Sequence, residues 1–251
     1  MNRAKRPNAD YFNSDLHLHM FNICNTTEGT NYIYLYDERD SGKAGNTVCS
    51  MRWHYHVSYL TALLSSGRQT PSMIIKCMDN CVGQNKSQVT MMFDCLLSLI
   101  LYERVANFFL LPGHSHMRAD QLVSLSKRAL NKKDLFIPSQ IADAMNTDKG
   151  MNALVLKEGD FYEWETLLKK YFKPAPAGYT QNYCFEISGG SMLYKKTWDT
   201  DDTNLETHTY TAHVDSTRKA LLHDLFNLPS NATLTEILGE NFVCHVSLES
   251  H

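Results

Sequence analysis

The stretch Met73-Ile74-Ile75-Lys76-Cys77-Met78-Asp79-Asn80-Cys81-Val82-Gly83-Gln84-Asn85-Lys86 begins as an apolar run and ends as a polar loop. Further along the chain, Phe108-Phe109-Leu110-Leu111 is followed by Pro112-Gly113-His114-Ser115-His116 and then by Asp120. Short apolar runs between turn residues are typical of buried strands. Because ligands of α/β proteins gather outside the carboxyl ends of the strands, the two polar segments predict one functional site.

The segments around these two strands predict an α/β chain. Residues 16–23 alternate apolar and polar side chains, and with the β-rich run 32–36 they predict a hairpin. Helices are expected in three segments, 47–64, 87–105 and 117–130. The run 73–78 is typical of a strand buried on both faces. This order predicts a mixed sheet with an antiparallel edge hairpin, in which 73–78 and 108–111 are adjacent parallel strands.

Beyond residue 135 the pattern is weaker and predicts a second region. Residues 161–172 suit an amphipathic helix, and the proline-rich segment 174–178 suits a hinge. Residues 183–187 and 209–214 suit strands. We therefore expect a core domain over residues 11–135 and a C-terminal α+β extension over residues 136–251.

The composition narrows the class of protein. The chain has 251 residues, of which 43% are hydrophobic and 20% charged, as expected of a globular protein with a core. No apolar run reaches the roughly 18 residues that span a bilayer, so no membrane association is expected. The formal net charge of -3 makes any nucleic-acid binding local. The 7 scattered cysteines suit a reduced, intracellular protein, for which the nucleus is one candidate location.

The octet Asp79–Lys86, together with Gly113-His114-Ser115-His116 and Asp120, resembles a known pattern. It is similar to the DNCxGQNK and GHxHxxxD motifs of an uncharacterised eukaryotic domain family with a transposon-like distribution. The segment 34–38, with the glycines that follow it, resembles another part of that family. The resemblance covers about residues 11 to 175.

The resemblance implies an integrase or transposase core with a ribonuclease H-like fold. In that fold the first strand supplies one catalytic aspartate, the fourth strand a second, and the last helix a third acid. Asp79 and Asp120 stand at the latter two places. Nothing before residue 11 forms the first strand, so we expect a mixed sheet flanked by helices that lacks it. Asp15 and Asp37 are the candidates for the missing carboxylate.

The same resemblance implies roles for individual residues. Asp79 and Asp120 would bind Mg²⁺ or Mn²⁺, because hard cations prefer carboxylate oxygens. His116, four residues before Asp120, would act in proton transfer. The polar stretch Gln84, Asn85 and Lys86 would bind the phosphates of DNA. Simpler interpretations are that Asp79 caps a turn, that Asp120 is favoured by a helix dipole, and that residues 84–86 are an ordinary helix entry.

Three functions remain open at this point. The leading hypothesis is a divalent-metal-dependent polynucleotidyl transferase or nuclease of transposase or integrase type. Without the first acid, the chain is expected to cleave DNA weakly or not at all. The second hypothesis is an inactive, domesticated derivative that binds nucleic acid or protein. The third is a zinc-dependent hydrolase or zinc-stabilised module that uses Cys77, Cys81, His114 and His116.

Overall fold

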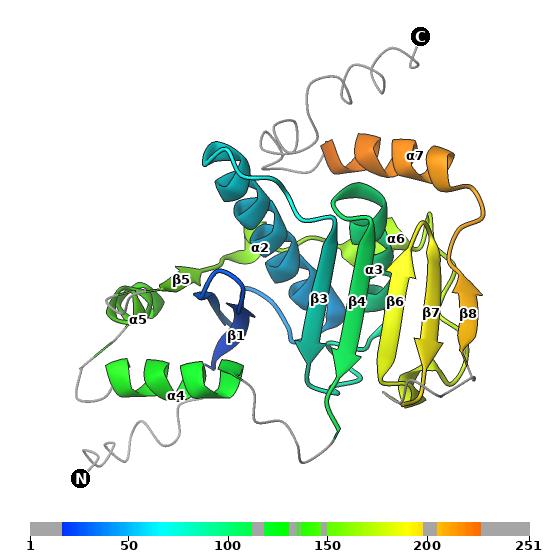
Figure 1. The fold of residues 1–251 in the computed structure, drawn as a ribbon. Helices are drawn as coiled ribbons and strands as arrows, with labels where there is room; N and C mark the ends of the chain where they lie inside the picture. Colours follow the sequence, from blue (N-terminus) through cyan, green and yellow to red (C-terminus); the bar gives the residue numbers. More distant parts are fainter. Residues whose placement is uncertain are drawn as a thin grey trace. The chain divides into compact units, whose positions relative to one another are not determined.

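The computed structural model describes residues 17–111, 118–130, 135, 137–146, 150–197 and 205–226 (Figure 1). The chain folds into two compact units, each made of two segments. The first unit comprises Met1–Gly42 and Met117–Asp160, and the second comprises Lys43–His116 and Phe161–His251. In the part of the chain that the structure describes, no helix is long and apolar enough to cross a membrane.

The second unit is built on a five-stranded mixed sheet with the order β3-β4-β6-β7-β8. The strands are β3 (Met73–Met78), β4 (Arg104–Phe109), β6 (Cys184–Ser188), β7 (Ser191–Lys195) and β8 (Glu206–Thr209). β3 and β4 are parallel, with Met78 opposite Phe109, which confirms the prediction that these two runs are adjacent parallel strands. The other three pairs in the sheet are antiparallel.

Helix α3 (Gln88–Ile100) is the centre of the second unit's core. It packs against β4 and β6 and against three other helices: α2 (Gly45–Ser65), α6 (Trp164–Leu168) and α7 (Val214–Phe226). Every residue from Val89 to Ile100 is buried, as the apolar circumference of this segment predicts. The Ser87 hydroxyl accepts the Thr90 N–H at 3.2 Å and so caps the first turn. The helix ends before the predicted residue 105 because β4 begins at Arg104.

Strand β3 differs from the prediction of a strand buried on both faces. Within the described residues it pairs only with β4, so it is an edge strand of its sheet. Ile75 is 64% exposed and Cys77 is exposed, whereas Lys76 points toward α3 and pairs with Asp94. The prediction was wrong because an apolar run does not reveal whether a strand lies at the edge of its sheet.

The first unit contains the predicted hairpin, formed by β1 (Leu18–Asn25) and β2 (Thr30–Asp37). The hairpin is not an edge of the sheet that holds β3. Instead, β2 pairs in parallel with β5 (Met151–Val155) and completes a separate three-stranded sheet. Helices α4 (Arg118–Leu130) and α5 (Pro138–Met145) pack on this sheet, and a small core forms from Ile33, Leu35, Leu122, Ala142, Met145, Met151 and Ala153.

The two units do not follow the predicted linear division at residue 135. Strand β5 returns to β2, and β6 returns to β4, so each unit draws on both halves of the chain. The predicted strand over 209–214 is also corrected, because β8 ends at Thr209 and α7 begins at Val214. The architecture is α/β with mixed sheets flanked by helices. Within the described residues the only strand beside β3 is β4, which carries Asn107 and no acid.

Candidate functional site

The candidate site lies at the carboxyl end of β3 and β4. The Leu110 N–H donates to the Met78 carbonyl at 2.9 Å, so the two strands end side by side. Asp79 therefore follows β3 at the edge of the sheet where β4 also ends. His114 and His116 lie outside the described residues. The role predicted for His116 and the zinc alternative accordingly stay predictions.

The octet Asp79–Lys86 closes on itself through two side-chain hydrogen bonds. The Asn85 Nδ2 group donates to Asp79 Oδ1, and the Lys86 ammonium donates to Asn80 Oδ1 at 2.6 Å. Both bonds join residues six apart in the sequence. The first and second residues of the octet thus pair with the seventh and eighth. This double closure gives a physical reason for the Asp-Asn and Asn-Lys pairs at its two ends.

The backbone of the octet supports the same closure. The Cys81 carbonyl accepts the N–H groups of Gln84 at 3.2 Å and Lys86 at 3.1 Å. Val82 and Gly83 are left exposed at the tip of the loop. No atom lies within 4 Å of the position that a Cβ of Gly83 would occupy. The loop is therefore fixed at its base and open at its tip.

Lys86 connects the loop to a second segment of the chain. Its side chain is completely buried, and its ammonium also donates to the Thr180 carbonyl at 2.9 Å. The Tyr179 hydroxyl donates to the Lys86 carbonyl at 2.7 Å. The ammonium lies 4.6 to 5.8 Å from the centroids of three aromatic rings, those of Phe109, Tyr183 and Phe185. Burial lowers the pKa of Lys86 to about 8.

This burial bears on the phosphate-binding role predicted for residues 84–86. A phosphate contact needs an accessible ammonium, and that of Lys86 is enclosed by its own loop and the aromatic rings. Asn85 is also buried, whereas Gln84 is half-buried. In this structure Asn85 and Lys86 hold the loop in shape rather than face solvent.

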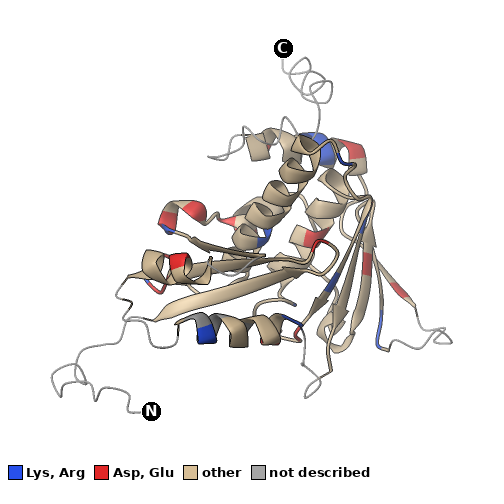
Figure 2. Cartoon of the chain, turned by 60° about the vertical axis from the view of Figure 1, so that its left-hand side comes forward, with Lys and Arg blue, Asp and Glu red and all other residues tan. Residues whose placement is uncertain are grey.

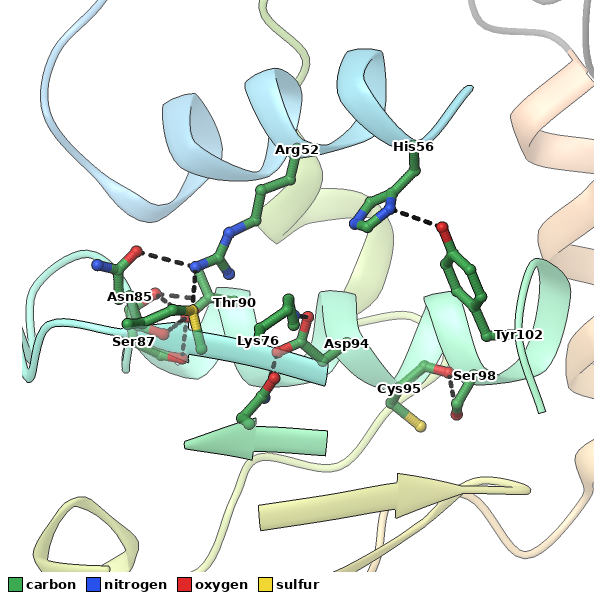
Figure 3. Close-up of polar contacts among 12 residues, drawn as sticks. Arg52, His56, Lys76, Asn85, Ser87, Thr90, Asp94, Cys95, Ser98 and Tyr102 are labelled. Atoms are coloured by element: carbon green, nitrogen blue, oxygen red, sulfur yellow. Dashed lines mark hydrogen bonds and ion pairs between the residues drawn. The ribbon is translucent and has the colours of Figure 1, made fainter. Parts of the chain in front are cut away.

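Arg52 of α2 approaches the loop from the core side (Figure 3). Its Nη2 group donates to Asn85 Oδ1 at 2.8 Å. The Asn85 carbonyl in turn accepts the Thr90 hydroxyl at 3.1 Å. The Arg52 side chain is buried, and its Nη1 group has no hydrogen-bond partner among the described residues. Arg52, Asn85 and Asp79 therefore form a chain of hydrogen bonds from the core to the end of β3.

A buried ion pair lies beneath the site, between β3 and α3 (Figure 3). The Lys76 ammonium pairs with Asp94 Oδ1, and the Asn107 side chain donates to Asp94 Oδ2 at 2.6 Å. Burial lowers the pKa of Lys76 to about 8; Asp94 opposes this shift and Arg52 adds to it. His56 donates to or accepts from the Tyr102 hydroxyl at 2.9 Å, and its burial lowers its pKa well below the usual value.

Sequence reasoning missed this network of buried charges, although part of it carried a signal. Lys76 interrupts an apolar strand and Asp94 interrupts an apolar helix. Lone charges of opposite sign in apolar segments are rarely buried unless they are paired. Arg52 gave no such signal, because the polar residues His54 and His56 follow it on the same helix and its charge does not stand alone in an apolar segment.

Asp79 is the exposed acidic residue of this site. Its side chain is exposed, and within the described residues only Asn85 hydrogen-bonds to it. One carboxylate oxygen is thereby fixed, and the other accepts no hydrogen bond from the described residues, which suits a ligand of a hard cation. No group of three histidine, cysteine, aspartate or glutamate residues in the described ranges is arranged to hold a metal. Metal binding by Asp79 therefore stays a prediction.

The other predicted carboxylates belong to the first unit. Asp120 is exposed in the first turn of α4, and because Asp79 is in the second unit, the convergence of the two stays a prediction. The carboxylate of Asp37, by contrast, is already bound by a neighbouring arginine. Arg39 donates to both of its oxygens, at 3.1 and 2.7 Å, and this hydrogen bonding holds the pKa of Asp37 well below its usual range. Asp37 closes the turn after β2.

Charged residues are distributed over both units (Figure 2). Acidic and basic positions are interspersed along the helices and strands that the structure describes. Four basic residues, Lys127, Arg128, Lys132 and Lys133, lie close together in the sequence; of these, Arg128 is exposed on α4, while Lys132 and Lys133 lie outside the described residues. DNA binding accordingly stays a prediction, and the net charge of the chain would confine it to a local surface.

Comparisons with known proteins place most of the chain in one family. A family model described as a domain of unknown function, DUF7869, matches residues 14–201, which are more than half of the chain. The matched residues include the octet, Asp120 and strands from both sheets. The search of curated proteins found no match, and the search of solved structures found none either.

Proposed function

We propose that this chain, which belongs to the DUF7869 family, is a divalent-metal-dependent nuclease or polynucleotidyl transferase of transposase or integrase type. The observation that carries the proposal is the placement of Asp79. Its exposed carboxylate is held by Asn85 at the shared carboxyl end of two parallel strands. In the sequence, the histidine-containing segment follows the second of these strands. Sites of α/β proteins form at such edges.

The proposal assigns a role to each residue. Asp79 and Asp120 would hold Mg²⁺ or Mn²⁺. The buried ion pair of Lys76 and Asp94 would keep the base of the site rigid. The cation, when bound, activates water or a 3′-hydroxyl and stabilises the leaving oxygen of a DNA phosphodiester. His116 would move a proton near neutral pH. A ribonuclease H-like arrangement of these groups is part of the proposal.

Nicking of supercoiled plasmid in Mn²⁺ tests the function. The chain is used in excess over the plasmid, since weak cleavage is expected. Asp79→Asn should lower the nicking rate at least tenfold, because it removes the anionic ligand. Asp143→Asn is the matched control, since Asp143 is an exposed aspartate on α5 in the first unit, and it should nick like the wild type. Equal nicking by wild type and Asp79→Asn would overturn the proposal.

A second candidate is a DNA-binding module without catalysis. One observation favours it: the described residues bring no three metal-capable side chains together. Fluorescence anisotropy with a labelled DNA duplex separates the two functions. Binding that weakens steeply with salt, without any Mn²⁺-dependent nicking, would support the binding module. Cleavage that depends on Asp79 would eliminate it.

A further inference from the structure

We infer that Arg52 is a positioning residue for Asp79, and that it acts by fixing which way the Asn85 amide points. Its Nη2 group donates to Asn85 Oδ1 at 2.8 Å (Figure 3), while Asn85 Nδ2 donates to Asp79 Oδ1. The consequence for metal binding rests on the function proposed above. The positional role itself does not.

The argument begins with the chemistry of the two side chains. A guanidinium only donates hydrogen bonds, whereas a primary amide donates at one end and accepts at the other. With the Asn85 oxygen toward Arg52, the NH₂ group faces Asp79. The reversed amide would set NH₂ against the Arg52 donors and an oxygen against the Asp79 carboxylate. Both contacts would be repulsive, and buried Asn85 has little water to relieve them.

The burial of Arg52 supports a role beyond packing. Arg52 is 4% exposed, and within the described part of the chain it forms no ion pair. Its only oxygen acceptor there is Asn85, and Nη2 also contacts the Met78 sulfur. A buried guanidinium without a carboxylate is costly, and a methionine would fill a similar volume without this cost. Local violations of packing rules of this kind are typical of functional sites.

The charges that face Arg52 leave Asn85 as its specific partner. Lys76 from β3 and His56 from its own helix both interact electrostatically with the guanidinium, and the Asp94 carboxylate of the same buried network is bound by Lys76 and Asn107 instead. The Nη2 group of the guanidinium thus contacts one amide oxygen and the Met78 sulfur, and no carboxylate of the described residues pairs with it. Exchange of Arg52 for an apolar residue should free that amide to turn over.

The first experiment reads the amide directly by NMR in ¹³C,¹⁵N-labelled protein. The scalar coupling across the hydrogen bond from Asn85 Nδ2 to the Asp79 carboxyl carbon should be present in the wild type. In Arg52→Met it should fall at least twofold, because both amide orientations become populated. In Arg52→Lys, which keeps a donor, most of the coupling should return. An undiminished coupling in a folded Arg52→Met variant would overturn the inference.

The second experiment measures Mn²⁺ affinity by calorimetry for the same proteins. Arg52→Met should weaken Mn²⁺ binding about tenfold, and Arg52→Lys should restore most of the affinity. If Asp79→Asn weakens binding while Arg52→Met does not, the inference fails and the metal site stands. If Asp79→Asn has no effect, the metal site fails, and the NMR coupling still decides the role of Arg52. Urea unfolding of Arg52→Met confirms that the variant is folded.

Discussion

Replacement of Lys76 by methionine removes the cation that neutralises Asp94 in the core of the second unit. Asp94 is completely buried, and its remaining partner would be the Asn107 amide at 2.6 Å. Breaking a buried ion pair by removal of one partner costs about 3–5 kcal/mol. A domain is stable by only about 5–15 kcal/mol, so Lys76→Met should lose a large share of the unfolding free energy.

The reciprocal variant should be milder. In Asp94→Asn the lysine remains, but its pKa, which Asp94 raises in the wild type, falls below about 8, and its side chain is 11% exposed. Lys76 can therefore release its proton near pH 7, and the loss of unfolding free energy should be smaller than in Lys76→Met. The double variant Lys76→Met, Asp94→Asn contains no charge at either position. It should recover to within about 1 kcal/mol of the wild type.

Urea unfolding, monitored by tryptophan fluorescence, measures the unfolding free energies of these variants in the second unit of the chain. Trp53 and Trp164 are buried in the same core, with ring centroids 5.5 Å apart. A Trp198→Phe background removes the third tryptophan of the chain. The reasoning is refuted if Lys76→Met costs less than about 1 kcal/mol, or if the double variant is as unstable as Lys76→Met.

Two further predictions concern the octet loop and the packing of α2 against the start of α3. Burial lowers the pKa of Lys86 to about 8, whereas an unfolded lysine titrates near 10.5. Above pH 8 the unfolded state therefore binds more protons than the folded state, and the unfolding free energy rises with pH. The stability of wild type relative to Lys86→Met should therefore increase by about 1 kcal/mol from pH 8 to pH 9 in urea titrations, and no change would contradict it. Gly45→Ala would place its Cβ 2.7 Å from Ser87 Oγ and 3.1 Å from Val89 Cβ. In thermal unfolding it should cost about 1–3 kcal/mol, whereas Gly83→Ala, with open space around it, should be near neutral; equal effects would argue against the packing.

The parts of the fold that depend on local pattern could be predicted from the sequence. The hairpin, the run 73–78 and the apolar helix after Ser87 each lie within one continuous segment, and the structure confirms them. The pairings of β2 with β5 and of β4 with β6 join segments far apart in the sequence. Local periodicity carries no information on such partners, so the hairpin was assigned to the wrong sheet and β6 to a region apart from β4.

The candidate site, like the fold, could be predicted only where it depends on local sequence pattern. The octet could be singled out, because its polar residues follow an apolar strand directly. The roles of Asn85 and Lys86 could not, because their partners lie six residues back in a loop without regular periodicity. The aromatic rings around Lys86 come from two different strands and the segment between Tyr179 and β6. Only the folded chain brings them together.

Paramagnetic broadening by Mn²⁺ in backbone NMR spectra tests most directly whether Asp79 is a metal ligand. The account predicts that substoichiometric Mn²⁺ broadens the amide signals of residues 79–85 and Leu110 first, since these lie at the shared end of β3 and β4. Asp79→Asn should abolish that broadening, and Asp143→Asn should leave it unchanged. Broadening centred elsewhere, or unaffected by Asp79→Asn, would contradict the account.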